Sequence, residues 1–397
     1  MTKMNRFSFL LLFTFYLTRL QAQTVLTEQE AVTLALKKSP LINAAALQVE
    51  QQRQLNRTGF NLSNPDITLE SPTGEFMTVG VLQSFEFPTV YIKQGQLARE
   101  QTFLVGKAKV LIESEVKQQV KIAYLELQFA YKLLTLLKIQ DSIYSAIATA
   151  ADRQFAAGQI DFVAKTYAAV QYGEVHNQYL RAQADADLAL RQLQFYTGIS
   201  DSIVTTPLKS STTLLVEGIA TDSAILAGTP VIQYSLQAQS VSRKSFQVEK
   251  NKALPGFSFG YMNQGAKNTE MPFRLRAGIN VPVWFWQYKS AIKAAKTNKQ
   301  ISEQTTLAQW QNLHSKLQQP KSDAIKNQTS LNYYEKTGLK QSEDLITAAS
   351  RMFSAGQTDY ITYLRTLSDA YGIQVKYLET LRAFHQSVIN INNLIGQ

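Results

Sequence analysis

A ten-residue segment that occurs twice constrains this chain more than any other feature of its sequence. RQFAAGQIDF begins at Arg153 and RMFSAGQTDY begins at Arg351, 198 residues later, and six of the ten positions are identical. The same offset relates Gly80 to Gly278, whereas upstream segments match at an offset of 190 because the second copy carries an insertion near residues 265–270. A period this long indicates a duplicated domain rather than a solenoid of short repeats.

The duplication divides the chain into four parts. We expect a signal peptide, a first structural repeat, a connector rich in serine and threonine, and a second structural repeat, over residues 1–23, 24–198, 199–221 and 222–397. The first part has Lys3 and Arg6 before an apolar run and Ala22 near a cleavage site, as secretory signal peptides do. The run has about eleven residues, whereas an uncleaved membrane anchor needs about 20. We therefore predict an exported chain.

Each copy is predicted to fold as a helix, a β-hairpin, a very long helix, a tight turn and a returning helix. In the first copy, Thr27 and Glu30 form a capping box for a helix that ends near residue 60. Apolar residues spaced three and four apart then predict a helix over 91–154. A helix of about 65 residues spans roughly 100 Å, and the opening helix and the returning helix together match that length. We expect an antiparallel layer of one continuous and one broken helix, with a kink or local unwinding at Pro320 in the second copy.

Four segments alternate apolar with polar residues, as the strands of hairpins do. Their apolar positions are Ile67, Leu69, Met77, Val79, Val81, Phe85, Phe87, Phe257, Phe259, Tyr261, Phe273, Leu275, Ala277, Ile279, Val281 and Val283. This period is typical of transmembrane barrel strands, although a sheet packed on a soluble core shows the same alternation. Aromatic residues at the strand ends resemble an interfacial girdle and favour the membrane; they are Phe87, Trp284, Phe285 and Trp286.

The polar positions of these strands are expected to face a lumen. Arg274 and Arg276 either point into that lumen or pair with Asp66, Glu70 or Glu86 on neighbouring strands. Four strands are too few to close a barrel, and open sheet edges are not tolerated in lipid. The chain is therefore predicted to oligomerise, since three copies supply twelve strands.

The composition excludes several other classes of protein. The chain has no cysteine and only three histidines, far apart in sequence, so disulfide scaffolds and histidine metal clusters are not expected. It contains no GxSxG motif, no HExxH motif and no glycine-rich phosphate loop, so we predict no catalytic, cofactor-binding or metal-binding residue and no enzyme activity. The net charge of +10 would suit nucleic acid, but the export signal argues against that partner.

The signal peptide, the duplicated unit, the two hairpins, the long helices and the FxAGQxD turn together resemble the outer-membrane factor (TolC) family over essentially the whole mature chain. The segment 356–364, GQTDYITYL, is similar to the turn that opens the family's last helix. Two features depart from the family pattern. The chain lacks the lipobox cysteine of the lipoprotein members, and Arg365 stands where the family often carries an aspartate.

The resemblance implies a fold class and a function. The fold would be mainly α, with long antiparallel helices forming a trimeric α-barrel and four strands per chain contributing to a twelve-stranded β-barrel. The chain would be the outer-membrane exit duct of a tripartite efflux or secretion system. It would lie in the outer-membrane lipid, extend into the periplasm, and passively conduct substrates from a periplasmic membrane-fusion adaptor and an RND-type or ABC-type inner-membrane pump. The alternative is a periplasmic coiled-coil adaptor or scaffold without a membrane barrel. The substrate and the pump class are not indicated.

The two repeated turns are the predicted contact with the adaptor at the periplasmic tip. The residues concerned are Phe155, Gly158, Gln159, Asp161, Phe353, Gly356, Gln357 and Asp359. We expect both aspartates to cap the returning helices and both glycines to adopt a positive φ. The first turns of the returning helices are expected to close the tip, which makes Tyr363 and Arg365 candidate gate residues.

Overall fold

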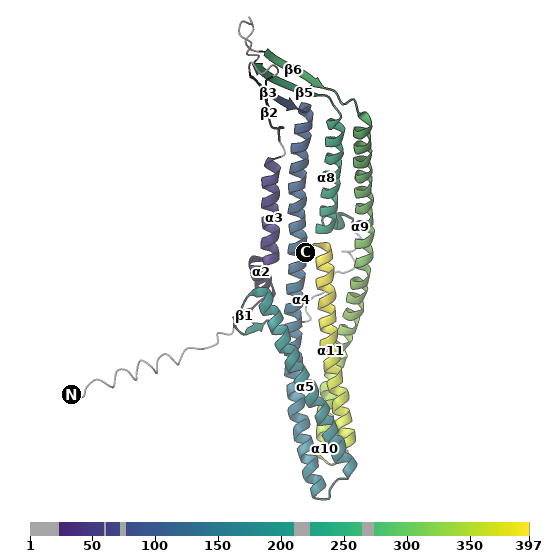
Figure 1. Cartoon of the computed structure of the whole chain (residues 1–397). Coiled ribbons are helices and arrows are strands. Elements are labelled where there is room, and N and C mark those ends of the chain that lie inside the picture. Colours follow the sequence, from purple (N-terminus) through teal and green to yellow (C-terminus); the bar gives the residue numbers. More distant parts are fainter. Residues whose placement is uncertain (1–23, 59–60, 72–76, 210–222, 264–273, 397) are drawn as a thin grey trace, which may run out of the picture. The chain divides into compact units, whose positions relative to one another are not determined.

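The computed structural model describes residues 24–58, 61–71, 77–209, 223–263 and 274–396 (Figure 1). The predicted signal peptide, the insertion in the second copy, Phe273 and most of the connector lie outside these residues.

The chain forms two compact units, and each takes segments from both repeats. Unit 1 comprises residues 1–39, 115–220 and 317–393, and unit 2 comprises residues 40–114, 221–316 and 394–397. The two repeats nevertheless have the same order of elements. In the first copy these are α2 (Glu28–Lys38), α3 (Pro40–Arg57), β2 (Asp66–Glu70), β3 (Thr78–Phe85), α4 (Pro88–Ala156) and α5 (Phe162–Thr197). In the second copy they are α7 (Ser223–Ala227), α8 (Pro230–Lys252), β5 (Gly256–Asn263), β6 (Arg274–Asn280), α9 (Phe285–Tyr333), the π-helical turn η1 (Tyr334–Gly338), α10 (Leu339–Ser354) and α11 (Tyr360–Ile395).

The opening helix is broken, and the prediction of one helix up to residue 60 is wrong. The capping box of Thr27 and Glu30 is present at the start of α2, but α2 ends at Lys38 and α3 begins at Pro40. Ser39 between them is extended, with φ −62° and ψ 121°. The proline ring disfavours the helical conformation for the residue before it, so the helix stops there.

The predicted long helix is confirmed. α4 has 69 residues, and α9, η1 and α10 follow each other without a break from Phe285 to Ser354. The helical assignment continues through Pro320, so the predicted unwinding does not occur there. The irregular turn is η1, where Gly338 is buried so closely against Tyr334 that a Cβ atom would lie 3.0 Å from that ring.

Unit 1 is held together by an aromatic core and by a small parallel sheet. The core is rich in tyrosine; it consists of Tyr144, Ile147, Ala151, Ala168, Val175, Ala349, Tyr360, Tyr363, Leu364, Leu367 and Tyr371. β1 (Thr24–Leu26) pairs in parallel with β4 (Ile203–Thr205) in the connector, and the hydroxyl of Tyr124 donates to the carbonyl of Leu26 at 2.8 Å. This pairing was not predicted, because two three-residue strands carry no period.

Unit 2 contains the four predicted strands as one antiparallel sheet in the order β2-β3-β5-β6. α8 is joined to α4 by Gln237, whose Nε2 lies 2.6 Å from an oxygen of Glu100, and to α9 by the hydroxyls of Ser242 and Ser302 at 2.6 Å. Among the described helices, none combines the length and the hydropathy needed to cross a membrane.

Candidate conduit surface and docking turns

The sheet of unit 2 separates its side chains into an apolar face and a polar face. Its register places Ile67, Val81, Tyr261 and Leu275 in one row across all four strands. All four are exposed, and Leu275 is 86% exposed. A single exposed apolar residue is ordinary, but a continuous exposed face of this kind marks a surface that is covered by another phase or partner.

The opposite face of the sheet is mostly polar and carries the two predicted lumen residues. Arg276 lies in one row with Gly260, Leu82 and Asp66, and Arg274 lies in the next row with Met262, Gly80 and Thr68. Within the described part of the chain no ion pair joins either arginine to Asp66, Glu70 or Glu86. The reason is spacing: β6 and β2 are the two edges, three strand steps or about 14 Å apart.

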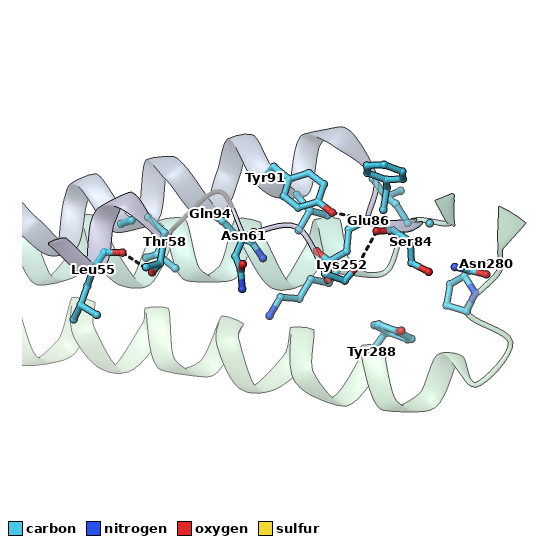
Figure 2. A pocket seen from close by; sticks show the side chains of 18 of the residues that line it. Leu55, Thr58, Asn61, Ser84, Glu86, Tyr91, Gln94, Lys252, Asn280 and Tyr288 are labelled. Atoms are coloured by element: carbon cyan, nitrogen blue, oxygen red, sulfur yellow. Dashed lines mark hydrogen bonds between the residues drawn. The ribbon is translucent and has the colours of Figure 1, made fainter. Parts of the chain in front are cut away.

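A polar cavity of about 930 Å³ adjoins this polar face within unit 2 (Figure 2). Ser84, Gly256 and Asn280 belong both to the polar face and to the lining of the cavity. Amide side chains also line it: Gln52, Gln94 and Gln101 come from helices, and Asn61 comes from the loop between α3 and β2. Glu86 and Lys252 also line the cavity, so it carries one charge of each sign beside its neutral hydrogen-bonding groups. The sequence does not predict this cavity, because its lining residues come from six separate segments.

The predicted aromatic cluster lies at the start of α9, shortly after β6 ends. Trp284, Phe285 and Trp286 are all more than half exposed, and the rings of Trp284 and Trp286 lie 5.0 Å apart. Phe87, the fourth predicted residue, is half-buried and packs against Phe257 with its ring centroid 6.0 Å away. Three of the four predicted girdle residues therefore form one exposed surface.

The two repeated turns have the same backbone. Gly158 and Gly356 have φ values of +69° and +68°. In both turns the glycine N–H donates to the carbonyl of the phenylalanine three residues earlier. The N–H of the following glutamine donates to the carbonyl of the residue five positions earlier, at 2.8 Å in the first turn and 2.9 Å in the second. This is the Schellman motif, which ends a helix with a residue in the left-handed region. A Cβ atom would meet nothing within 4 Å at either glycine, so φ alone requires glycine there.

Both predicted caps are present. Asp161 accepts a hydrogen bond from the backbone N–H of Ala164 at 2.7 Å, and Asp359 accepts from that of Thr362 at 2.9 Å. The backbone and hydroxyl hydrogen bonds from Thr362 hold the pKa of the Asp359 carboxyl below its usual value.

The side chains around the two turns differ although the backbones match. Phe162, which opens α5, is 65% exposed, whereas Tyr360 at the equivalent position of α11 is 5% exposed. Phe353 stacks on Tyr363 with centroids 4.3 Å apart, while Phe155 contacts Phe162 and lies under the ammonium of Lys165. The first turn thus presents aromatic surface, and the second turn packs its aromatic rings inward.

The two candidate gate residues have different surroundings. Tyr363 is 8% exposed and belongs to the aromatic core of unit 1, with its hydroxyl 3.4 Å from that of Ser350. Arg365 is exposed on α11. The structure therefore places Arg365 at the surface of the chain and Tyr363 in its core.

No metal site is assembled in the described residues. They contain no group of three or more histidine, cysteine, aspartate or glutamate side chains that could hold a metal ion. Burial raises the pKa of Tyr144, Tyr360 and Tyr371, and burial together with the charge of Glu335 raises the pKa of Tyr377 to about 12. These hydroxyls therefore stay neutral at physiological pH.

Comparison with known proteins shows which solved structures share this fold. No protein-family model matches the chain, and no curated protein matches it in sequence. Solved structures do match. The CmeC outer membrane channel of Campylobacter jejuni superposes with a TM-score of 0.77 at 14% identity, over 93% of this chain and 85% of CmeC. The outer membrane protein VceC of Vibrio cholerae gives 0.74 at 12% identity, over 93% and 96%.

A third match is the open state of the MtrE outer membrane channel of Neisseria gonorrhoeae, with a TM-score of 0.71 at 12% identity over 93% of this chain and 88% of MtrE. In each comparison nearly all of both chains is covered, so the likeness extends to the helices and the sheet together. The resemblance to the outer-membrane factor family is confirmed at the level of the fold, and the chain has the fold of bacterial outer-membrane channels.

Proposed function

We propose that this protein is the outer-membrane exit duct of a tripartite efflux or secretion system, extending into the periplasm. The observation that carries the proposal is the sheet of unit 2, which has one exposed apolar face, one polar face and, among the described residues, two unpaired edges. A periplasmic coiled-coil adaptor without a membrane barrel would not need a sheet with an exposed apolar face. The duct would conduct substrates passively rather than catalyse a reaction.

The two free edges of the sheet support a homotrimer. β2 and β6 run antiparallel to each other across the sheet order, so the β6 edge of one copy can pair with the β2 edge of the next. Three copies of four strands make twelve. A closed barrel removes every edge, which lipid requires, and leaves the polar face and its cavity toward the lumen.

The experiment is purification of the protein from outer membranes in detergent. We expect a trimer with three times the mass of the mature chain, and single-channel conductance after insertion into a planar bilayer. A monodisperse monomer that stays in aqueous buffer without detergent would exclude the proposal.

The two turns are the proposed contact with a periplasmic adaptor that joins the duct to an inner-membrane pump of the RND or ABC type. Their matched backbones would present six equivalent helix ends per trimer. Exposure of Gly158, Gln159, Gly356 and Gln357 supports this role, because the Schellman motif itself leaves both glutamine side chains unused.

Paired substitution of the turn glycines tests this contact. Gly158→Pro with Gly356→Pro reverses the sign of φ and removes an N–H donor from each turn, so we expect intact trimers with lost transport and lost adaptor cross-linking. Gly158→Asn with Gly356→Asn is the control, since asparagine tolerates a positive φ and keeps the donor. Normal transport by the proline pair would place the adaptor elsewhere.

A further inference from the structure

The start of α9 combines three features. The first is the exposed aromatic cluster of Trp284, Phe285 and Trp286, with exposed fractions of 65%, 66% and 56%. It directly follows the sheet strand whose apolar face is exposed. Tryptophan is enriched where a membrane protein passes from hydrocarbon to headgroups, because the ring is apolar and its N–H is polar.

The second feature is a run of unpaired positive charge. Lys289, Lys293 and Lys296 are exposed, and none of them forms an ion pair with a described residue. The first acidic residue of α9 is Glu303, and it pairs with Lys299 at 3.4 Å. With 3.6 residues per turn, Lys289 and Lys296 lie on the same face of the helix as Phe285.

The third feature is a cleft of about 340 Å³ beside this face. Its lining is apolar apart from two lysines and a tyrosine hydroxyl; it consists of Ala253, Pro282, Phe285, Tyr288, Lys289, Ile292 and Lys293. All of these residues belong to unit 2. One cleft therefore offers an apolar wall and two ammonium groups at once.

We propose that this cleft binds an anionic phospholipid of the membrane leaflet at which β6 ends. An acyl chain would lie against Phe285 and Ile292, and the headgroup phosphate would accept hydrogen bonds from Lys289 and Lys293. Lys296 would add charge one turn further on. The proposal rests on the proposed membrane insertion, and it assigns to this chain a lipid class rather than membrane contact alone.

The combination of features selects this ligand over simpler ones. A free phosphate would account for the lysines but not for the apolar wall or the exposed aromatic cluster. A zwitterionic lipid would pack its acyl chain against the apolar wall, but its headgroup, which has no net charge, would gain little from three positive charges. Lysine stems can lie along an apolar surface while the ammonium reaches the headgroups, and each basic residue near an anionic surface strengthens binding about fivefold.

Native mass spectrometry of the detergent-purified trimer tests the proposal. Phosphatidylglycerol and phosphatidylcholine with the same acyl chains are offered to the wild type and to the triple variant Lys289→Gln, Lys293→Gln, Lys296→Gln. The control variant Lys326→Gln, Lys336→Gln, Lys340→Gln removes the same charge from exposed lysines elsewhere. We expect retention of phosphatidylglycerol to fall more than about tenfold in the first variant and to stay unchanged in the control, with weak phosphatidylcholine retention throughout.

A second variant examines the apolar wall. Ile292→Gln should weaken phosphatidylglycerol retention without changing the charge, and inorganic phosphate should compete poorly. Equal retention of both lipids, equal loss in both triple variants, or full displacement by phosphate would each overturn the lipid site. Dissociation of the trimer on removing the three lysines would show that a second copy fills the cleft, which also overturns it. Failure of the wild type to form trimers would instead refute the duct itself.

Discussion

At the scale of single residues, the two repeats show what each copy has kept and what it has changed. Gly158 and Gly356 are kept because a positive φ is needed in both turns. Phe162 and Tyr360 occupy equivalent positions, but Tyr360 is buried and its hydroxyl has no hydrogen-bond partner among the described residues. A buried polar group without a partner costs about 1–3 kcal/mol, since it has lost water and gained nothing.

Removing that hydroxyl should therefore stabilise the protein. We expect Tyr360→Phe, which restores the residue of the first copy, to raise the free energy of unfolding by about 1 kcal/mol. Thermal unfolding of the purified protein measures it. Tyr371→Phe in the same core is a comparison, and Tyr360→Ala should destabilise through the cavity it leaves. A lower melting temperature for Tyr360→Phe would mean that the hydroxyl has a partner in the assembled protein.

At the scale of elements, the faces of β6 carry the strongest prediction. Leu275 and Arg276 are neighbours in sequence, lie on opposite faces of the sheet, and are both exposed in the chain. If the apolar face meets lipid, Leu275→Arg should cost about 2–4 kcal/mol at the membrane midplane, while Arg276→Gln should cost little. The measurement is the yield of assembled protein in outer membranes. Equal yields from the two variants would refute the assignment of the apolar face to lipid.

How far the elements could be predicted depends on whether their signal is local. The long helix and the four strands follow from periods of 3.6 and 2 that extend over many residues, and both were predicted. The break between α2 and α3 also has a local signal, Pro40, and its counterpart Pro230 opens α8. The predicted helix ran through this proline, although proline disfavours the helical conformation of the residue before it.

The remaining features arise from packing between distant segments. The pairing of β1 with β4 joins residues about 180 positions apart along the chain, and no pattern in either strand selects the other. In the π-helical turn, Gly338 lies so close to α11 that a Cβ atom would be 3.6 Å from Ile373. Similarly, the sequence predicts the caps and the positive-φ glycines of the turns, but the burial of Tyr363 follows only from its stacking on Phe353.

At the scale of the whole molecule, the two edge strands carry opposite charge on the same face. β2 contributes Asp66 and Glu70, and β6 contributes Arg274 and Arg276, all on the polar face of the sheet. They are too far apart to pair within one chain. If three copies close into a barrel, each β6 edge meets the β2 edge of the next copy. The charges are then complementary at every junction and would repel in a pairing of like edges.

Charge reversal tests this junction between copies. Arg274→Glu with Arg276→Glu should lower the yield of trimers, because four carboxylates then meet at each of the three junctions. Asp66→Lys with Glu70→Lys should do the same, and the chain that carries all four substitutions should recover. Neutralising Arg276 alone removes one exposed pair, worth less than about 1 kcal/mol, which is why Arg276→Gln is expected to be tolerated.

The control is Lys326→Glu with Lys340→Glu, which changes the net charge equally at exposed helix positions. Recovery in the fourfold variant would show that the edges recognise each other by charge, whereas additive loss would leave backbone pairing and the apolar face as the forces that assemble the trimer.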